Sequence, residues 1–90
     1  MENWDVELPA TVRTSIKSIK EPWRAEIIQA ITDLAEDPFP PDSIQLENFD
    51  GQYRIRVGGY RIVYSVSRSK RRVVVTRVRP RQTAYSGLER

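Results

Sequence analysis

Residues 53–85 read YRIRVGGYRIVYSVSRSKRRVVVTRVRPRQTAY, a run in which apolar and basic residues alternate between two short polar breaks. The alternation predicts three strands, at residues 53–57, 60–67 and 72 to about 79. The glycine pair Gly58-Gly59 strongly favours a hairpin, because tight hairpin turns need a positive φ that glycine adopts at low cost. We therefore expect a three-stranded antiparallel meander.

Alternation also divides the side chains of this meander between two faces. In the first strand Arg54 and Arg56 point away from the apolar residues. In the third strand Arg77 and Arg79 have the same parity as the apolar Val75. If both hairpins keep their apolar sides together, the arginines converge on one surface, which would hold Arg54, Arg56, Arg61, Arg77, Arg79 and Arg81. This predicts a sheet with one arginine-lined face.

The N-terminal part of the chain predicts a strand and two helices. Trp4, Val6 and Leu8 alternate with acidic residues, which predicts a short strand that ends at Pro9 and joins the sheet. Apolar residues at helical spacing predict helices from residue 10 to about 19 and from about 22 to 36. The core-facing side of the second helix is expected to contain Trp23, Ile27, Ala30, Ile31 and Leu34. The proline-rich residues 37–42 end that helix.

This order of elements predicts an α+β fold. An N-terminal strand and a two-helix hairpin would pack on a mainly antiparallel sheet with a C-terminal three-strand meander. With 90 residues and no internal repeat, the chain is expected to form a single domain over residues 1–90. Residues 82–88 would add a short terminal turn or helix. The helices would cover one face of the sheet and leave the arginines for function.

The composition excludes several kinds of site. The chain has no Cys and no His, which excludes thiolate nucleophiles, disulfides and histidine-based triads. We expect neither a metal nor a cofactor. No apolar run approaches the roughly 18 residues of a membrane span, and the acidic start lacks the features of a signal peptide. We expect a cytoplasmic protein with no membrane partner.

The net charge of +3 hides a strong asymmetry. From Arg54 onward there are eleven Lys and Arg against one Glu, whereas the first 53 residues carry four against eleven acids. The two parts therefore have net charges of +10 and −7. A basic strand face can simply be solvated, but arginine binds phosphate oxygens bidentately and stays protonated near neutral pH. We favour a nucleic-acid phosphate backbone as the partner of the basic half.

Two segments together resemble the RelE/ParE toxin superfamily. They are the hairpin YRIRVGGYRIVY at residues 53–64 and RPRQTAY at residues 79–85, and residues 34–38 and Leu46 are also similar to the family. The resemblance spans nearly the whole chain and implies the microbial RNase fold. It also implies the toxin of a type II toxin–antitoxin system with an acidic antitoxin partner. The RelE branch cuts mRNA in the ribosomal A site, and we expect that activity here.

The resemblance also implies roles for individual residues. Arg61 matches the arginine after the family's hairpin turn, and Arg81 and Tyr85 match its C-terminal arginine and tyrosine. The expected catalytic residues are Arg56, Arg61, Arg81 and Tyr85, where Tyr85 either stacks on a base or packs against the fold. Further RNA contacts are expected from Arg54, Lys70, Arg71, Arg72, Arg77 and Arg79. The ribosome and its mRNA are the expected partners.

One departure from the family leaves the general base unassigned. Arg54 stands where RelE toxins often have a lysine, and its pKa of roughly 12.5 or more makes it a poor proton acceptor. Glu47, a carboxylate shortly before the hairpin, is a candidate, and rRNA groups or solvent are alternatives. Two other functions stay open: a ParE-like inhibitor of gyrase, and a noncatalytic RNA or ribosome binder.

Overall fold

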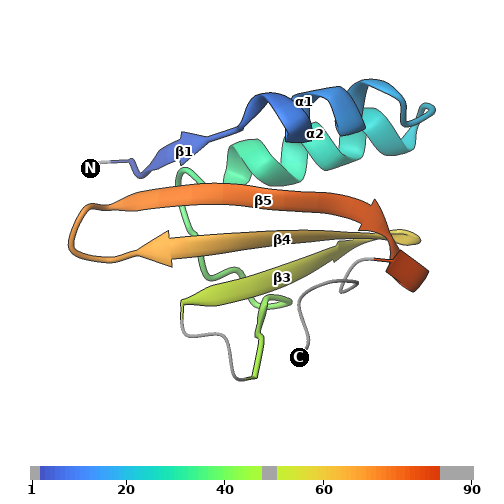
Figure 1. Cartoon of the computed structure of the whole chain (residues 1–90). Helices are drawn as coiled ribbons and strands as arrows, with labels where there is room; N and C mark the ends of the chain where they lie inside the picture. The colour runs from blue at the N-terminus through green and yellow to red at the C-terminus, as the bar shows by residue number, and fades with distance from the viewer. Residues whose placement is uncertain (1–2, 48–50, 84–90) are drawn as a thin grey trace.

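A computed structural model of the chain describes residues 3–47 and 51–83 (Figure 1). Two helices cover one face of a five-stranded sheet. In chain order the elements are β1 (Asp5–Glu7), α1 (Ala10–Lys17), α2 (Trp23–Asp33), β2 (Ile44–Gln45), β3 (Gln52–Val57), β4 (Tyr60–Ser67), β5 (Arg72–Pro80) and the short 3₁₀ helix η1 (Arg81–Thr83). Neither α-helix is long and apolar enough to span a membrane, within these described residues.

The sheet has the strand order β1-β5-β4-β3-β2. The predicted meander is confirmed, because β3, β4 and β5 pair antiparallel in succession. The predicted N-terminal strand joins it as the parallel neighbour of β5, with Val6 opposite Val73. β2 was not predicted as a strand; it pairs antiparallel with β3 at the other edge. The predicted α+β fold is confirmed, with a mixed sheet of five strands.

The two helices form the expected hairpin, since α2 runs back beside α1 (Figure 1). α2 ends at Asp33, three residues before the predicted end. Beyond Asp33 the chain tightens, because the N–H groups of Leu34, Ala35 and Glu36 each bond the carbonyl three residues earlier. Such short bonds satisfy the last carbonyls of a helix while ending its regular geometry.

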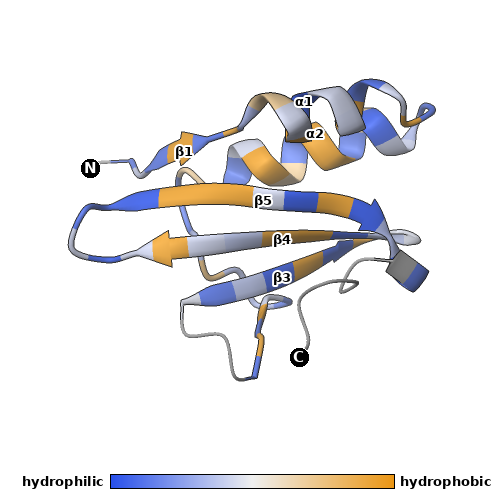
Figure 2. Ribbon diagram, viewed as in Figure 1, coloured by the Kyte–Doolittle hydropathy of each residue, from blue (hydrophilic) through white to orange (hydrophobic). Residues whose placement is uncertain are grey.

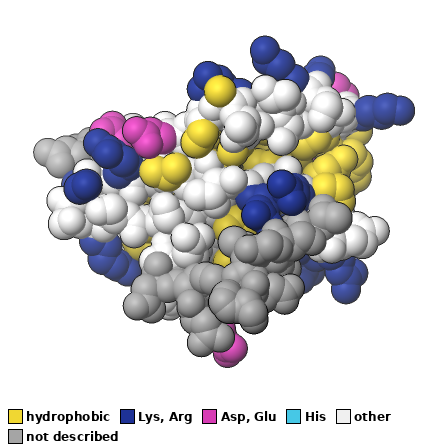
Figure 3. Space-filling model, viewed as in Figure 1, with side chains coloured by type: hydrophobic (Ala, Val, Ile, Leu, Met, Phe, Trp, Pro, Cys, Tyr) yellow, Lys and Arg dark blue, Asp and Glu magenta, His cyan; other side chains and the backbone are white. Residues whose placement is uncertain are grey.

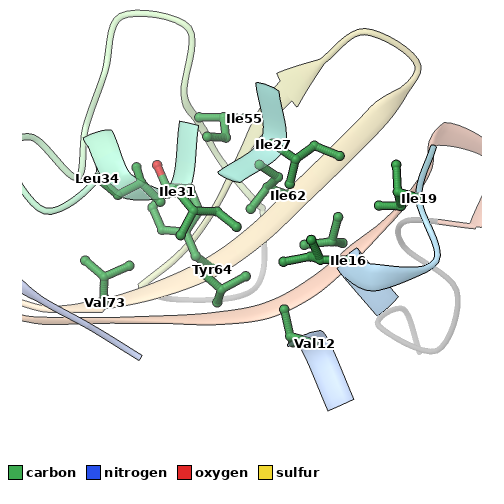
Figure 4. Close-up of a cluster of buried hydrophobic side chains, with 12 residues drawn as sticks. Val12, Ile16, Ile19, Ile27, Ile31, Leu34, Ile55, Ile62, Tyr64 and Val73 are labelled. Atoms are coloured by element: carbon green, nitrogen blue, oxygen red, sulfur yellow. The ribbon is translucent and has the colours of Figure 1, made fainter. Parts of the chain in front are cut away.

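The core lies between the helices and the sheet. Figure 2 shows hydrophobic residues along α2 and along the central strands. Apolar side chains of both helices pack against those of the strands (Figure 4). The core includes Val12 and Ile16 of α1, Ile27 and Ile31 of α2, and Ile62, Tyr64, Val73 and Val75 of the sheet. Tyr64 is fully buried, and its hydroxyl donates to the carbonyl of Pro38 at 2.8 Å. Burial raises the pKa of Tyr64 to about 12.

The prediction that Trp23 belongs to the core is wrong. Its side chain is 39% exposed, although it opens the apolar face of α2. A methyl group placed on Gly58 would come within 2.8 Å of Cε3 of Trp23, so the indole packs directly on the β3–β4 turn. Gly58 also has a φ of +57°, which favours glycine. The indole is therefore used to hold the turn rather than to fill the core.

Candidate nucleic-acid interface

A β-bulge in β5 decides which way its arginines point. Val63 of β4 pairs with Arg77, but the next residue, Tyr64, pairs with Val75. Thr76 is thus the extra residue of the bulge, and its Oγ1 donates to the carbonyl of Val63 at 3.1 Å. Because of this extra residue, odd-numbered residues of β5 before and after the bulge point to opposite faces of the sheet. Val75 therefore faces the helices, while Arg77 turns to the opposite face of the sheet.

Beyond the bulge, three arginines lie in one row across the sheet. Arg56 of β3 is directly opposite Arg61 of β4, which is directly opposite Arg79 of β5. Side chains at paired positions of neighbouring strands share a face, with Cβ atoms about 5 Å apart. A second row contains Arg54, Val63 and Arg77. The structure thus brings Arg54, Arg56, Arg61, Arg77 and Arg79 to one face, which we call the arginine face.

The central arginine of the first row is held by backbone carbonyls. Arg61 is only 7% exposed. Its Nη1 donates to the carbonyl of Tyr60 at 3.1 Å and, more weakly, to that of Gly58 at 3.4 Å. Trp23 packs on the same Gly58. The guanidinium of Arg61 is therefore oriented by the β3–β4 turn at Gly58-Gly59, which we call the glycine turn.

Like charges on the arginine face perturb one another. Burial lowers the pKa of Arg77, and the positive charge of Arg79 lowers it further. Like charges at adjacent cross-strand positions destabilise a sheet. A bound anion would relieve this repulsion, so the face favours a phosphate or carboxylate group.

Arg81 reaches the same end of the sheet by a backbone contact. It opens η1 directly after β5, and its N–H donates to the carbonyl of Gly59 at 2.9 Å. The glycine turn therefore lies next to both Arg61 and Arg81. We call the residues Arg56, Arg61, Arg79 and Arg81 around this turn the glycine-turn cluster. Tyr85, the other residue expected here, lies outside the described residues.

The other basic residues that were expected to contact RNA lie at the opposite end of the sheet. Lys70, Arg71 and Arg72 belong to the β4–β5 turn and the start of β5. β4 has eight residues, so about 3.3 Å per residue places the two ends roughly 23 Å apart. Figure 3 shows Lys and Arg side chains at both ends in one view. The structure therefore separates Lys70, Arg71 and Arg72 from the other basic residues that were expected to contact RNA.

Among the residues that the structure describes, Asp42 is a carboxylate beside the arginine face. A cleft of about 350 Å³ is lined by Pro41, Asp42, Ile44, Arg54 and Arg56. Glu47, the carboxylate that the sequence suggested as a general base, is exposed and does not line this cleft. Sequence analysis missed Asp42, although the apolar pair Ile44 and Leu46 hinted that this segment approaches β3. Within the described part of the chain, no three Asp and Glu side chains form a group that could hold a metal.

A family model described as the ParE toxin of the type II toxin–antitoxin system parDE matches residues 6–85. The fold is similar to RelE of a RelE–RelB complex from Pyrococcus horikoshii, with a TM-score of 0.77 and 25% identity over 87% of this chain and 94% of that chain. A RelB–RelE complex from Methanococcus jannaschii is similar with a TM-score of 0.75 and 22% identity, over 92% of this chain and 99% of that chain. Isolated RelE of E. coli is similar with a TM-score of 0.74 and 20% identity, over 86% of this chain and 83% of that chain. No curated protein matches the sequence as a relative.

Proposed function

This chain belongs to the ParE toxin family of type II toxin–antitoxin systems, within the RelE/ParE superfamily, and we propose that it is a ribosome-dependent endoribonuclease. It would act in the cytoplasm, cut mRNA in the ribosomal A site and thereby inhibit translation. The observation that carries this proposal is the row of Arg56, Arg61 and Arg79, with Arg81 held at the same turn. Four cations at one end of a sheet complement the negative charge that develops on a phosphodiester under attack.

In the proposed reaction the ribose 2′-OH attacks the adjacent phosphorus. The 2′-O–P bond forms and the P–O5′ bond breaks, which leaves a 2′,3′-cyclic phosphate and a free 5′-hydroxyl. Negative charge develops on the phosphoryl oxygens, where preorganised cations are most effective. Arg61 and Arg56 would bind these oxygens, because they are paired across β3 and β4. The carbonyl bonds of Arg61 fix its guanidinium before the substrate arrives.

Arg81 would stabilise the leaving O5′ oxygen, which takes its proton from solvent, and Tyr85 would stack on a base. The proton of the 2′-OH must go to a group other than these arginines, since guanidinium groups do not deprotonate near neutral pH. The ribosome would supply much of the orientation of the mRNA, and orientation alone can lower a reaction barrier by several kcal/mol. A site without histidine can therefore be sufficient.

An acidic antitoxin is the proposed partner when the toxin is not on a ribosome. Some of the matched structures are RelE–RelB complexes. The arginine face of this chain offers the charge complementarity for a negatively charged segment, so binding should weaken as salt rises. The remaining RNA contacts, Arg54, Arg77, Lys70, Arg71 and Arg72, would add affinity for the ribosome rather than take part in the chemistry.

Primer extension on mRNA in a purified translation system tests the proposal. We expect new 5′ ends inside the A-site codon with wild-type protein, none on naked mRNA, and none with Arg61→Ala or Arg81→Ala. Arg24→Ala is the matched control, because Arg24 lies on α2 in an exposed ion pair with Glu21. Ribosome binding with intact mRNA would show a noncatalytic binder instead.

The match to the ParE family model favours a second candidate, inhibition of gyrase. The resemblance to ParE toxins implies that activity, because the hairpin motif of this chain is common to the RelE and the ParE branches. A supercoiling assay on purified gyrase separates the two. Inhibition that survives Arg61→Ala and Arg81→Ala, with mRNA left intact, would favour the gyrase inhibitor.

A further inference from the structure

The cleft beside the arginine face has the composition of a nucleotide site. Its volume of about 350 Å³ is at the small end of the range for ligand pockets, roughly 300 to 1,000 Å³. Two walls differ in chemistry: Arg54 and Arg56 form a cationic side, whereas Pro41 and Ile44 form an apolar side. The Ile44 side chain is 49% exposed. An exposed apolar wall beside two guanidinium groups suits a base attached to a phosphate.

Strand pairing joins this cleft to the glycine-turn cluster. Ile44 of β2 pairs with Arg54 of β3, so the two side chains share the arginine face. Arg56, two residues further along β3, lines the cleft and also stands opposite Arg61. A strand of RNA whose phosphate contacts Arg56 and Arg61 would therefore place a neighbouring nucleotide in the cleft.

Asp42 gives the cleft a selective group. A carboxylate only accepts hydrogen bonds and repels phosphate, so Asp42 would face the base rather than the backbone. Carboxylates in nucleic-acid readers accept from the exocyclic amino group of cytosine. Adenine carries an amino group at C6 and guanine carries one at C2, whereas uracil has the O4 carbonyl oxygen where cytosine has its amino group. A carboxylate acceptor beside two guanidinium groups therefore distinguishes cytosine and other amino-bearing bases from uracil.

We infer that this cleft binds one base of the mRNA and that Asp42 selects an amino-bearing base over uracil. The identity of the ligand as mRNA rests on the proposed function. Ile44 and Pro41 contact the ring, Arg54 and Arg56 contact the attached phosphate, and Asp42 accepts from the amino group. Asp42 is a specificity residue and has no part in the bond-breaking step.

The first test compares cytosine with uracil, which have the same ring size. Ribosomes are programmed with mRNAs that differ by C or U at one position of the A-site codon, each position in turn, and the single-turnover cleavage rate is measured. At one position we expect C to exceed U by about tenfold, the effect of one charged hydrogen bond. Asp42→Asn, which can both donate and accept, should reduce the ratio to within twofold. Glu26→Gln, on α2 at the other face, should leave it unchanged. Equal rates for C and U, or a ratio that Asp42→Asn does not alter, would overturn the inference.

The second test needs neither ribosome nor cleavage. The full chain, labelled with ¹⁵N, is titrated with cytidine or uridine 5′-monophosphate, which carry the same phosphate. We expect millimolar binding of the cytidine nucleotide with shifts at the amides of Asp42 and Ile44 and at the Nε groups of Arg54 and Arg56. Asp42→Asn should remove the preference. If no mRNA is cut but this selectivity is seen, the cleft site stands and the endoribonuclease proposal fails. Equal or absent shifts for both nucleotides overturn the site, whether or not mRNA is cut.

Discussion

The two ends of the sheet are both rich in arginine, yet they hold it in different ways. At the β4–β5 end the guanidinium of Arg68 lies 4.4 Å from the ring centre of Phe39, and that of Arg71 lies 4.5 Å from the ring of Trp4. At the glycine-turn end, Arg56, Arg61 and Arg79 stand opposite one another. A cation on an aromatic face already has a favourable partner, worth about 0.5 to 1 kcal/mol at an exposed site. Cations that face each other repel, and an added anion lowers that repulsion.

The rings at the β4–β5 end also contact one another. Phe39 meets Trp4 and Tyr53 edge to face, at centroid distances of 6.2 and 5.1 Å. Tyr53 stacks on the buried Tyr64 at 5.9 Å. This aromatic cluster joins the N-terminal segment, the proline-rich loop and two strands. Basic charge alone therefore does not distinguish the two ends: Arg68 and Arg71 lie on aromatic rings of the fold, whereas Arg56, Arg61 and Arg79 lie beside one another on neighbouring strands.

The largest effect on stability is expected at the glycine turn. Gly58→Ala should lower the free energy of unfolding by about 2 to 3 kcal/mol, because it adds left-handed strain and a clash with Trp23. Thermal or urea unfolding measures this loss. Gly59→Ala is the matched control, since a methyl group there meets nothing within 4 Å, and it should cost under about 1 kcal/mol. Equal costs at the two glycines would show that Trp23 does not hold the turn.

At the aromatic end, Phe39→Ala should lower stability by about 2 kcal/mol, somewhat less than for a fully buried ring. Phe39→Leu keeps most of the bulk and should cost about 1 kcal/mol, which isolates the ring and cation contacts. Urea unfolding gives both values. When folded, both variants should cleave mRNA within twofold of wild type. A tenfold loss of activity would remove the distinction between the two ends.

Arg79→Ala should separate activity from stability. We expect the protein concentration that gives half-maximal cleavage to rise about tenfold, since one phosphate contact is lost. Stability should stay the same or rise by a few tenths of a kcal/mol, because Arg79 repels the partly buried Arg77. Cleavage titrations and thermal unfolding of the same samples measure the two effects. A variant that loses both activity and stability would make Arg79 a structural residue.

Tyr64→Phe gives the smallest effect and a pH signature. At neutral pH the loss of the bond to Pro38 should cost about 1 kcal/mol. Burial raises the pKa of Tyr64 to about 12, whereas an unfolded tyrosine titrates near 10. Between these values the unfolded chain loses the proton first, so wild-type stability should fall by about 2 kcal/mol as the pH rises from 10 to 12. The stability advantage of wild type over Tyr64→Phe should therefore shrink above pH 10. A constant difference across this range would contradict a buried, protonated phenol.

The sequence predicts the meander well because alternation and a glycine pair are local signals. It cannot predict the bulge at Thr76, since a run of valines gives no sign of a one-residue change in parity. That change is what places Arg77 and Arg79 with Arg61. The exposure of Trp23 and the pairing of β1 with β5 also depend on contacts between distant segments. Arginine content indicated a basic site, but only strand register and ring contacts divide the arginines into two groups.

The most direct test compares one arginine from each end in the same assay. The single-turnover rate of mRNA cleavage is measured on one ribosome complex for wild type, Arg61→Ala and Arg71→Ala, with folding checked by circular dichroism. We expect Arg61→Ala to lower the rate at least about 100-fold, as removal of one transition-state donor does in other enzymes. Arg71→Ala should stay within about threefold. Similar losses for both variants, or an active Arg61→Ala protein, would contradict the assignment of the glycine-turn end as the active one.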